Sequence, residues 1–215
     1  MLLLIGRDVR AVMSVRDVFF GMGIITETVT PAGAAERISH RHSAVVAVGR
    51  ELGIGAGELL CGIRSAGANI PTVAIRDDVL SAEASLFDAV FPGSLYCAGV
   101  VSVISDIAKR RGLRPPGEYN FDRITRHGVG VTVGEEPLSL TKSEAAILSV
   151  VMAFSPISVG VRDIATLAFR GGRESSESGV RTHISAINRQ IFPHGYRITS
   201  RGDGYQIKIL SGSSE

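Results

Sequence analysis

The sequence predicts two folded parts of different classes: an α/β domain with a doubly wound parallel sheet, followed by a winged helix-turn-helix domain. Short apolar runs alternate with helix-like stretches through the first 111 residues. A basic segment with adjacent prolines then breaks this pattern. From Leu140 onward the apolar residues recur at helical spacing, and the chain closes with an alternating stretch around a glycine-rich turn. These periodicities are the strongest local signals of secondary structure.

The composition supports two hydrophobic cores. The chain has 215 residues, of which 45% are hydrophobic and 20% are charged. Domains cluster near about 100–150 residues, so this length suits two of them. The apolar content argues against disorder. The net charge of +2 does not by itself indicate a nucleic-acid partner, because a local basic stripe matters more than the sum.

Five short apolar runs in the front part predict strands. Each is closed by Gly, Pro, Arg or Asp, and they cover Leu2–Ile5, Ile24–Val29, Ala44–Val48, Thr72–Ile75 and Ala89–Phe91. Helices are expected between and after them, at 9–21, 31–39, 57–66, 80–87 and 95–111. Strands that are apolar throughout are buried on both faces, as in a parallel sheet flanked by helices. We therefore expect a (βα)5 arrangement.

A linker is expected at residues 112–123. A basic helix end is followed here by glycine and the Pro115–Pro116 pair, which cannot continue a helix. Residues 124–133 then alternate in polarity and turn at glycines, which predicts a small antiparallel sheet. These features place one domain at 1–111, a second at 124–210 and a short tail at 211–215.

Three helices and a hairpin are predicted in the second domain. Thr141 and Glu144 have the spacing of a capping box at the start of the first helix. The second helix is expected at 161–169 and the third at about 178–191. A hairpin over 196–209 then turns at 201–204. Three helices followed by a hairpin are the layout of a winged helix.

The third of these helices has one apolar and one polar face. Its apolar residues recur at i, i+4, i+7 and i+11 and predict a buried stripe of Val180, Ile184, Ile187 and Ile191. The opposite face carries Thr182, Ser185, Ala186 and Arg189, with Arg181 and His183 on its flanks and Asn188 near the apolar edge. Arginine can pair with guanine in the major groove, and a threonine or alanine methyl can touch thymine. An ordinary solvated helix face is the alternative interpretation of this helix taken alone.

Residues 124–209 resemble the OmpR/PhoB-type winged-helix effector domain. The resemblance is carried by Leu-Thr-Lys-Ser-Glu at 140–144, Val-Arg-Asp-Ile at 161–164, Val-Arg-Thr-His-Ile-Ser at 180–185 and Thr-Ser-Arg-Gly-Asp-Gly-Tyr at 199–205. It implies double-stranded DNA as the partner, read by the third helix, with Arg201 of the wing reaching the phosphate backbone or the minor groove. Together with the polar face, it gives an expected DNA-binding set of Arg181, Thr182, His183, Ser185, Ala186, Asn188, Arg189 and Arg201.

The chain departs from this family in the charge of the third helix. Relatives usually carry two or three basic residues where Ser185, Ala186 and Asn188 stand, and usually an aspartate where Arg181 stands. Fewer phosphate contacts imply weaker nonspecific binding and a shallower dependence of affinity on salt.

The front part resembles a receiver domain in element order and length but lacks its chemistry. A working receiver needs carboxylates, a hydroxyl and a lysine at its strand ends, where they hold Mg²⁺ and the phosphoryl group. The corresponding positions hold Gly6, Arg7, Val48, Arg76 and Phe91. The resemblance therefore implies an atypical response regulator that acts without aspartate phosphorylation.

The last stretch of the front part is unusually apolar and suggests a homodimer. Relatives pair two receivers through this region. Half of residues 95–107 must face the sheet, and the remainder, represented by Tyr96, Val100 and Val103, is expected to contact a second copy. Such a dimer would present two winged helices to two half-sites.

Several other interpretations stay open. The front domain would be a sensor if its vestigial site bound a small molecule or a partner protein. The winged helix would be a protein-binding module if it acted chiefly on a protein such as RNA polymerase. An α/β enzyme with an appended winged helix is the third, but no nucleophile–base pair, carboxylate pair or cofactor motif supports it. We expect no enzymatic activity, cofactor or metal.

The remaining signals favour a cytoplasmic protein. The apolar opening, residues 1–5, is too short for a signal peptide or a membrane span. Cys61 and Cys97 lack metal-ligand spacing and are expected to be two buried, reduced thiols. His40 and His42 are expected in an exposed loop, because no cysteine or carboxylate cluster accompanies them. The glycines at 53–57 lack the rest of a phosphate-binding motif and are expected to form turns.

Overall fold

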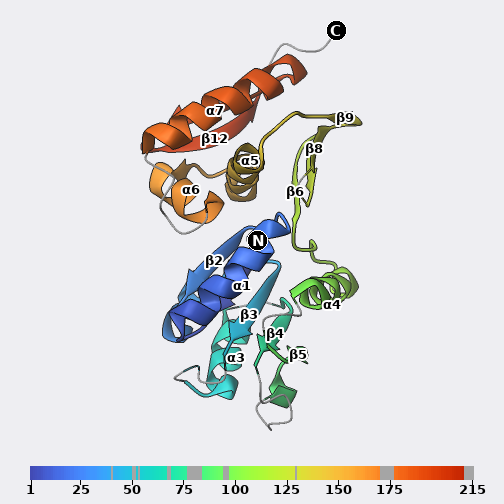
Figure 1. Ribbon diagram of the computed structural model, residues 1–215, viewed down its shortest axis with the longest axis vertical. Coiled ribbons are helices and arrows are strands. Elements are labelled where there is room, and N and C mark those ends of the chain that lie inside the picture. The colour runs from blue at the N-terminus through green and yellow to red at the C-terminus, as the bar shows by residue number, and fades with distance from the viewer. Residues whose placement is uncertain are drawn as a thin grey trace. The chain divides into compact units, whose positions relative to one another are not determined.

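The computed structural model describes residues 1–39, 41–49, 52, 54–66, 69–76, 84–93, 97–128, 130–169 and 177–210. The chain divides into two compact units, 1–116 and 117–215, which are coloured along the chain in Figure 1. The expected linker at 112–123 includes a strand of the second unit, Glu118–Phe121. No helix of the described residues is both long enough and apolar enough to cross a membrane.

The first unit contains a five-stranded parallel sheet, which confirms the predicted fold class. Its strands are β1 (Leu2–Ile5), β2 (Thr26–Val29), β3 (Ala44–Val48), β4 (Thr72–Ile75) and β5 (Ala89–Phe91). They lie in the order β2-β1-β3-β4-β5, and every neighbouring pair is parallel. The strand order reverses at β1, as it must in a doubly wound sheet.

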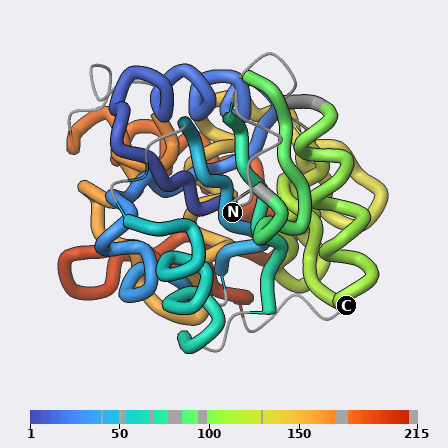
Figure 2. The backbone as a smooth tube through the Cα atoms, turned by 90° about the horizontal axis from the view of Figure 1, so that it is seen from below, coloured from blue at the N-terminus to red at the C-terminus, as the bar shows by residue number. Residues whose placement is uncertain are grey.

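Helices cover both faces of this sheet. They are α1 (Val9–Gly21), α2 (Ala34–Arg37), α3 (Ala56–Ser65) and α4 (Cys97–Arg110), with 3-10 turns η1 (Pro31–Gly33) and η2 (Ala84–Leu86). Phe19 of α1 and Ile104 of α4 pack in one core cluster with Leu2 and Leu4. Leu59 and Ile63 of α3 pack in the other with Leu3 and Ile5. Figure 2 shows α1 and α3 on opposite sides of the strands.

Two of the expected helices differ from the structure. The stretch predicted as one helix over 31–39 is the short turn η1 followed by the single-turn helix α2. Gly33 disfavours a continuous helix there, and the chain turns extended at Ile38. For the helix predicted at 80–87, residues 77–83 lie outside the described residues, and 84–86 form the 3-10 turn η2.

The second unit combines two antiparallel sheets with three helices. The four-stranded sheet contains β6 (Glu118–Phe121), β7 (Ile124–His127), β8 (Gly130–Val133) and β9 (Glu136–Pro137). Helices α5 (Lys142–Phe154), α6 (Val161–Ala168) and α7 (Glu177–Ile191) follow, and η4 (Phe192–His194) ends the last of them. The three-stranded sheet has the order β10 (Val159–Gly160), β12 (Gly204–Ile209) and β11 (Tyr196–Arg201).

Arg126 joins the four-stranded sheet to α5. Its side chain is buried, with 3% of the residue exposed, and it donates to the carbonyl of Gly128 at 2.7 Å and to that of Ala145 at 3.0 Å. A third bond reaches the hydroxyl of Ser149 at 2.5 Å. A buried guanidinium is tolerated only with such partners. The predicted capping box at the start of α5 is confirmed, with Thr141 and Glu144 bonded reciprocally.

A buried histidine lies at the amino-terminal edge of the first unit's sheet. His42 Nδ1 accepts a hydrogen bond from the backbone N–H of Ser39 at 3.1 Å, so Nε2 carries the proton that faces Glu27 Oε2 at 3.1 Å. Burial lowers the pKa of His42, although Glu27 opposes that shift. His42 is thus buried and bonded rather than part of an exposed loop, while His40 lies outside the described residues. The expectation of a buried thiol is likewise wrong for Cys61, which is exposed on α3.

This arrangement predicts a loss of stability in weak acid. His42 has a pKa below its ordinary value of 6.5 in the folded state, so below pH 6.5 the unfolded chain binds its proton first and unfolding is favoured. In urea titrations followed by circular dichroism at about pH 7 and about pH 5.5, wild type should lose stability relative to His42→Gln. The difference should approach at most ~1.4 kcal/mol per pH unit. Parallel pH profiles for the two proteins would contradict this.

Candidate nucleic-acid interface

Helix α7 has the predicted buried and exposed faces. Val180, Ile184, Ile187 and Ile191 are all buried, which confirms the apolar stripe. Among the expected DNA-binding residues, the exposed ones on this helix are Arg181, Thr182, Ser185 and Arg189, and Ala186 is partly exposed. The helix therefore offers a continuous outward face of small polar side chains between two arginines.

The hydroxyl groups of this face are already engaged as donors. Thr182 Oγ1 donates to the carbonyl of Ser178 at 3.1 Å, and Ser185 Oγ donates to that of Arg181 at 3.0 Å. Their oxygens retain lone pairs that can accept a hydrogen bond from a base amino group. In this arrangement the side-chain donors of the outward face are the guanidinium groups of Arg181 and Arg189.

His183 and Asn188, which were expected to contact DNA, interact with neighbouring elements of the second unit. The Nδ1 of His183 lies 3.8 Å from Glu144 Oε1 of α5, and its ring centroid lies 5.9 Å from that of Phe169. Asn188 donates from Nδ2 to the carbonyl of Ile198 at 2.9 Å and accepts at Oδ1 from the N–H of Ile198 at 2.7 Å. The hairpin formed by β11 and β12 is the wing. Asn188 therefore joins α7 to strand β11 of the wing through both the nitrogen and the oxygen of its side-chain amide.

The wing is also held from its other strand, β12. Gly204 pairs with Gly160 of β10, and a Cβ atom at Gly204 would lie 2.6 Å from the carbonyl oxygen of Val159. Only glycine permits this approach. Gln206 of β12 adds a hydrogen bond from Nε2 to the carbonyl of Pro156. The wing is thus fixed to β10 on one side and to α7 on the other.

The tip of the wing presents an arginine. Arg201 pairs with Gly204 across a two-residue turn, and Gly202 at its first central position has a φ of +58°, as hairpin turns of this length require. Arg201 is exposed, and its Nη1 lies 3.4 Å from Gln206 Oε1. The contact aligns the side chain along the hairpin while its remaining donors stay available.

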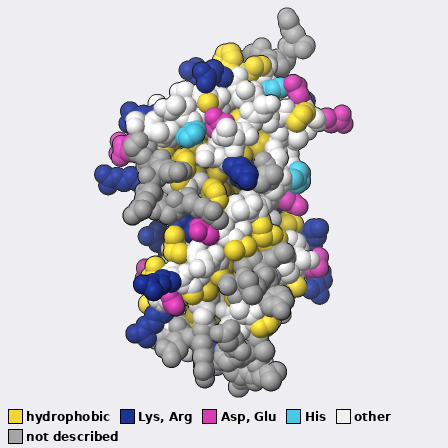
Figure 3. All heavy atoms as spheres, in the orientation of Figure 1, with side chains coloured by type: hydrophobic (Ala, Val, Ile, Leu, Met, Phe, Trp, Pro, Cys, Tyr) yellow, Lys and Arg dark blue, Asp and Glu magenta, His cyan; other side chains and the backbone are white. Residues whose placement is uncertain are grey.

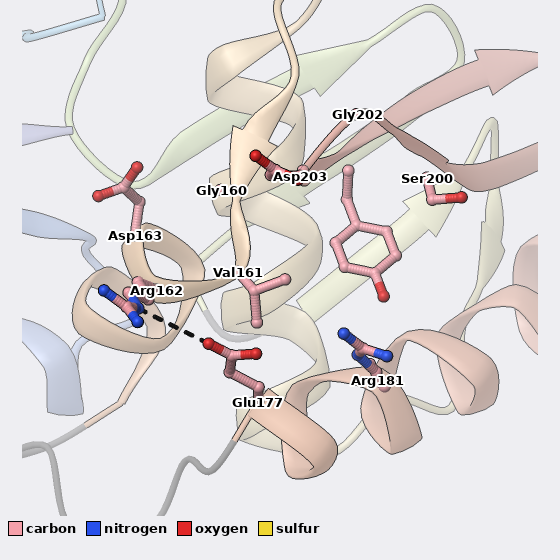
Figure 4. Close-up of a pocket in the computed structure, with 11 residues that line it drawn as sticks. Gly160, Val161, Arg162, Asp163, Glu177, Arg181, Ser200, Gly202 and Asp203 are labelled. Carbon is pink, nitrogen blue, oxygen red and sulfur yellow. Dashed lines mark ion pairs between the residues drawn. The ribbon is translucent and has the colours of Figure 1, made fainter.

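A groove joins the start of α6, the start of α7 and the wing (Figure 4). The residues that line it with charged or polar side chains are Arg162, Asp163, Glu177, Arg181, Ser200, Asp203 and Tyr205. Only Arg181 of these was in the expected DNA-binding set. Arg162 lies 3.6 Å from Glu177, measured from Nε to Oε1. The charged pair in the motif at 161–164 was the one signal in the sequence that could have placed Arg162 here.

In the first unit, the receiver-like positions lie at the carboxyl ends of the strands as expected. Gly6 follows β1, Val48 ends β3, Arg76 follows β4 and Phe91 ends β5. A Cβ atom at Gly6 would lie 2.8 Å from the carbonyl oxygen of Val48 and 2.5 Å from Val12 Cγ2. An acidic side chain therefore has no room at Gly6 unless its neighbours move.

The described charged residues around this edge have other contacts or point to solvent. Arg76 is buried, with 4% exposed, and Arg7 is exposed. Asp8 accepts hydrogen bonds from the N–H groups of Arg10 at 2.9 Å and Ala11 at 3.2 Å, and so caps α1. Within the described ranges, no three His, Cys, Asp or Glu side chains are grouped closely enough to hold a metal ion.

The expectation for the dimer surface needs a correction at Val100. Val100 is fully buried, with 0% exposed, in the core cluster that α4 shares with the sheet, so it cannot contact a second copy. Val103, which was expected at the same surface, is partly exposed. Tyr96 lies outside the described residues.

The two bonds of Asn188 predict a measurable loss on substitution. Asn188→Ala should lower the free energy of unfolding by about 1–3 kcal/mol, because it leaves the N–H and C=O of Ile198 without these partners. Gln190→Ala is the control, since Gln190 is exposed on the same helix, and its effect should stay within about 0.5 kcal/mol. Equal stabilities of the two variants in urea titrations would show that the hydrogen bonds between Asn188 and Ile198 contribute nothing to the free energy of unfolding.

Comparisons with known proteins find structural likenesses but no sequence family. No family model matches the chain, and no curated protein matches it. Among solved structures it is similar to a redox sensor of streptococci evolved from two-component response regulators, with 14% identity, 97% of this chain and 99% of that chain covered, and a TM-score of 0.40. It is similar to the response regulator DrrB, an OmpR/PhoB homologue of Thermotoga maritima, with 15% identity, 98% of each chain covered and a TM-score of 0.40. The DNA-binding domain of response regulator AdeR, solved with an intercistronic region, is 19% identical over 42% of this chain and 98% of that chain, with a TM-score of 0.37.

Proposed function

We propose that this protein is a sequence-specific DNA-binding transcription regulator that acts as a homodimer and without aspartate phosphorylation. The observation that carries the proposal is the outward face of α7, where Arg181 and Arg189 flank small polar side chains, held in fixed relation to Arg201 of the wing. A helix of this kind fits the major groove while the wing reaches the adjacent backbone or minor groove.

Independence from phosphorylation is supported by the carboxyl edge of the five-stranded sheet. The phosphoacceptor position holds Val48. An acidic side chain beside it would have to stand at Gly6, where Val12 and the backbone of Val48 fill the space. Buried Arg76 stands at the same edge, where a working receiver holds a Mg²⁺ ion and the phosphoryl group. Phosphoryl transfer to an aspartate needs both that ion and the acceptor.

The homodimer is supported by helix α4. Val103 is partly exposed on this helix, and Val101, which is also partly exposed, packs against the core cluster of the sheet. Partly exposed valines next to a buried stripe are the kind of surface that a second copy can cover symmetrically. Two copies would bring two winged helices to repeated half-sites on one duplex.

Selection of bound sequences from random duplex DNA tests this function. The purified full-length protein, with no phosphodonor and no Mg²⁺ added, should enrich a half-site that occurs twice at fixed spacing. Enrichment of a single half-site would support DNA binding but contradict the homodimer. No enrichment by protein whose circular dichroism shows an intact fold would contradict the DNA-binding function and favour a protein partner.

Two arginine variants should separate backbone contacts from base contacts. Arg201→Ala should weaken binding to all duplexes alike and reduce the slope of log affinity against log salt by about 0.9. Arg189→Ala should instead change the preference at one position of the selected site, by about 1–3 kcal/mol. Arg123→Ala removes the same charge from the exposed turn between β6 and β7 and serves as the control. Uniform effects of Arg189→Ala on all sites would contradict its role as a base reader.

A further inference from the structure

The groove beside the wing has a mixed charge that is unusual for a surface facing phosphates. Arg162 and Arg181 line it together with Asp163, Glu177 and Asp203, so carboxylates outnumber guanidinium groups among the described lining residues. On the face shown in Figure 3, the basic and acidic side chains are likewise interspersed instead of forming one basic stripe. Interfaces with DNA are normally much more positive than this.

Glu177 is the acidic residue best placed to change phosphate binding. It is the first residue of α7, and its carboxylate points into the groove toward Arg162 in Figure 4. The two groups are 3.6 Å apart, and their side chains are 55% and 92% exposed respectively. Exposed ion pairs of this kind contribute little to folding. A carboxylate near the start of a helix also interacts favourably with the helix dipole, but that role does not require an arginine partner across the groove.

The position of Arg162 explains why the pair matters for DNA. Arg162 lies in the first turn of α6, directly after β10, the strand that pairs with β12 of the wing. The same groove contains Arg181, which belongs to the outward face of α7. A duplex that contacts α7 and the wing together would bring its backbone past this groove. There Arg162 would attract a phosphate and Glu177 would repel it.

We propose that Glu177 is a specificity-determining residue that restrains nonspecific binding by pairing with Arg162 and repelling the phosphate backbone. This inference rests on the proposed DNA-binding function. The pair leaves Arg162 without a net phosphate contact, so sequence-independent affinity stays low while base contacts from α7 are unaffected. The ligand concerned is the backbone of double-stranded DNA, and the effect is on discrimination between sites.

The test compares Glu177→Gln with Glu135→Gln in the full-length protein. Both remove one negative charge, but Glu135 lies in the exposed turn between β8 and β9 and does not line the groove. Affinity for a duplex of arbitrary sequence and for a selected duplex is measured by fluorescence anisotropy across a salt series. Circular dichroism confirms that each variant is folded.

Glu177→Gln should bind the arbitrary duplex roughly two- to five-fold more tightly, the range equivalent to one exposed ion pair. Its slope of log affinity against log salt should be steeper by about 0.9, the value for one more phosphate contact. Glu135→Gln should leave that slope unchanged. The double variant Arg162→Gln/Glu177→Gln should return to the wild-type slope, which assigns the gained contact to Arg162. The ratio of selected to arbitrary affinity should fall in Glu177→Gln.

Several outcomes would overturn the inference. An unchanged salt slope in Glu177→Gln, or the same gain in Glu135→Gln, would mean that only the overall charge of the protein matters. If the tighter binding and the steeper salt slope persist in the double variant, Arg162 does not make the gained phosphate contact. These outcomes leave the DNA-binding function standing, since wild type still binds the duplexes. Failure of folded wild type to bind any duplex would instead contradict the proposed function itself.

Discussion

The fixed relation between helix α7 and the wing is the constraint on which the candidate interface depends. In the proposed function both contact one duplex at the same time, so their relative orientation has to be set before DNA binds. Two contacts set it: the paired hydrogen bonds between Asn188 and Ile198, and the close approach of Gly204 to Val159. Preorganised surfaces bind with less loss of conformational entropy than flexible ones.

This rigidity limits what the outward face can recognise. The hydroxyl groups of Thr182 and Ser185 donate to backbone carbonyls of the same helix. Arginines of the outward face therefore supply donors, and the hydroxyl oxygens supply acceptors. The acidic residues of the groove reduce the attraction for phosphates. In the proposed function, such an interface would rely on a few base contacts and on a second copy more than on charge. In the first unit, the crowding around Gly6 leaves no room for an acidic side chain unless its neighbours move.

Sequence reasoning was most successful where a feature depends on neighbours in the chain. The five strands of the first unit, the capping box of Thr141 and Glu144, and the buried face of α7 all follow from local periodicity, and the structure contains them. It failed where a residue depends on distant partners. The role of Asn188 is set by Ile198 on the hairpin, the place of Arg162 by the pairing of β10 with β12, and the burial of Val100 by the rotation of α4 on the sheet.

The most direct measurement is the change in backbone amide NMR signals of the full-length protein when a selected duplex is added. The account predicts that shifts concentrate on the outward face of α7, at Arg181, Thr182, Ser185 and Arg189, and on Arg201 of the wing. It also predicts that the amide of Ile198 keeps the signature of its bond to Asn188, because helix and wing bind as one body. Shifts confined to the four-stranded sheet or to the first unit, or a loss of the Ile198 bond on binding, would contradict it.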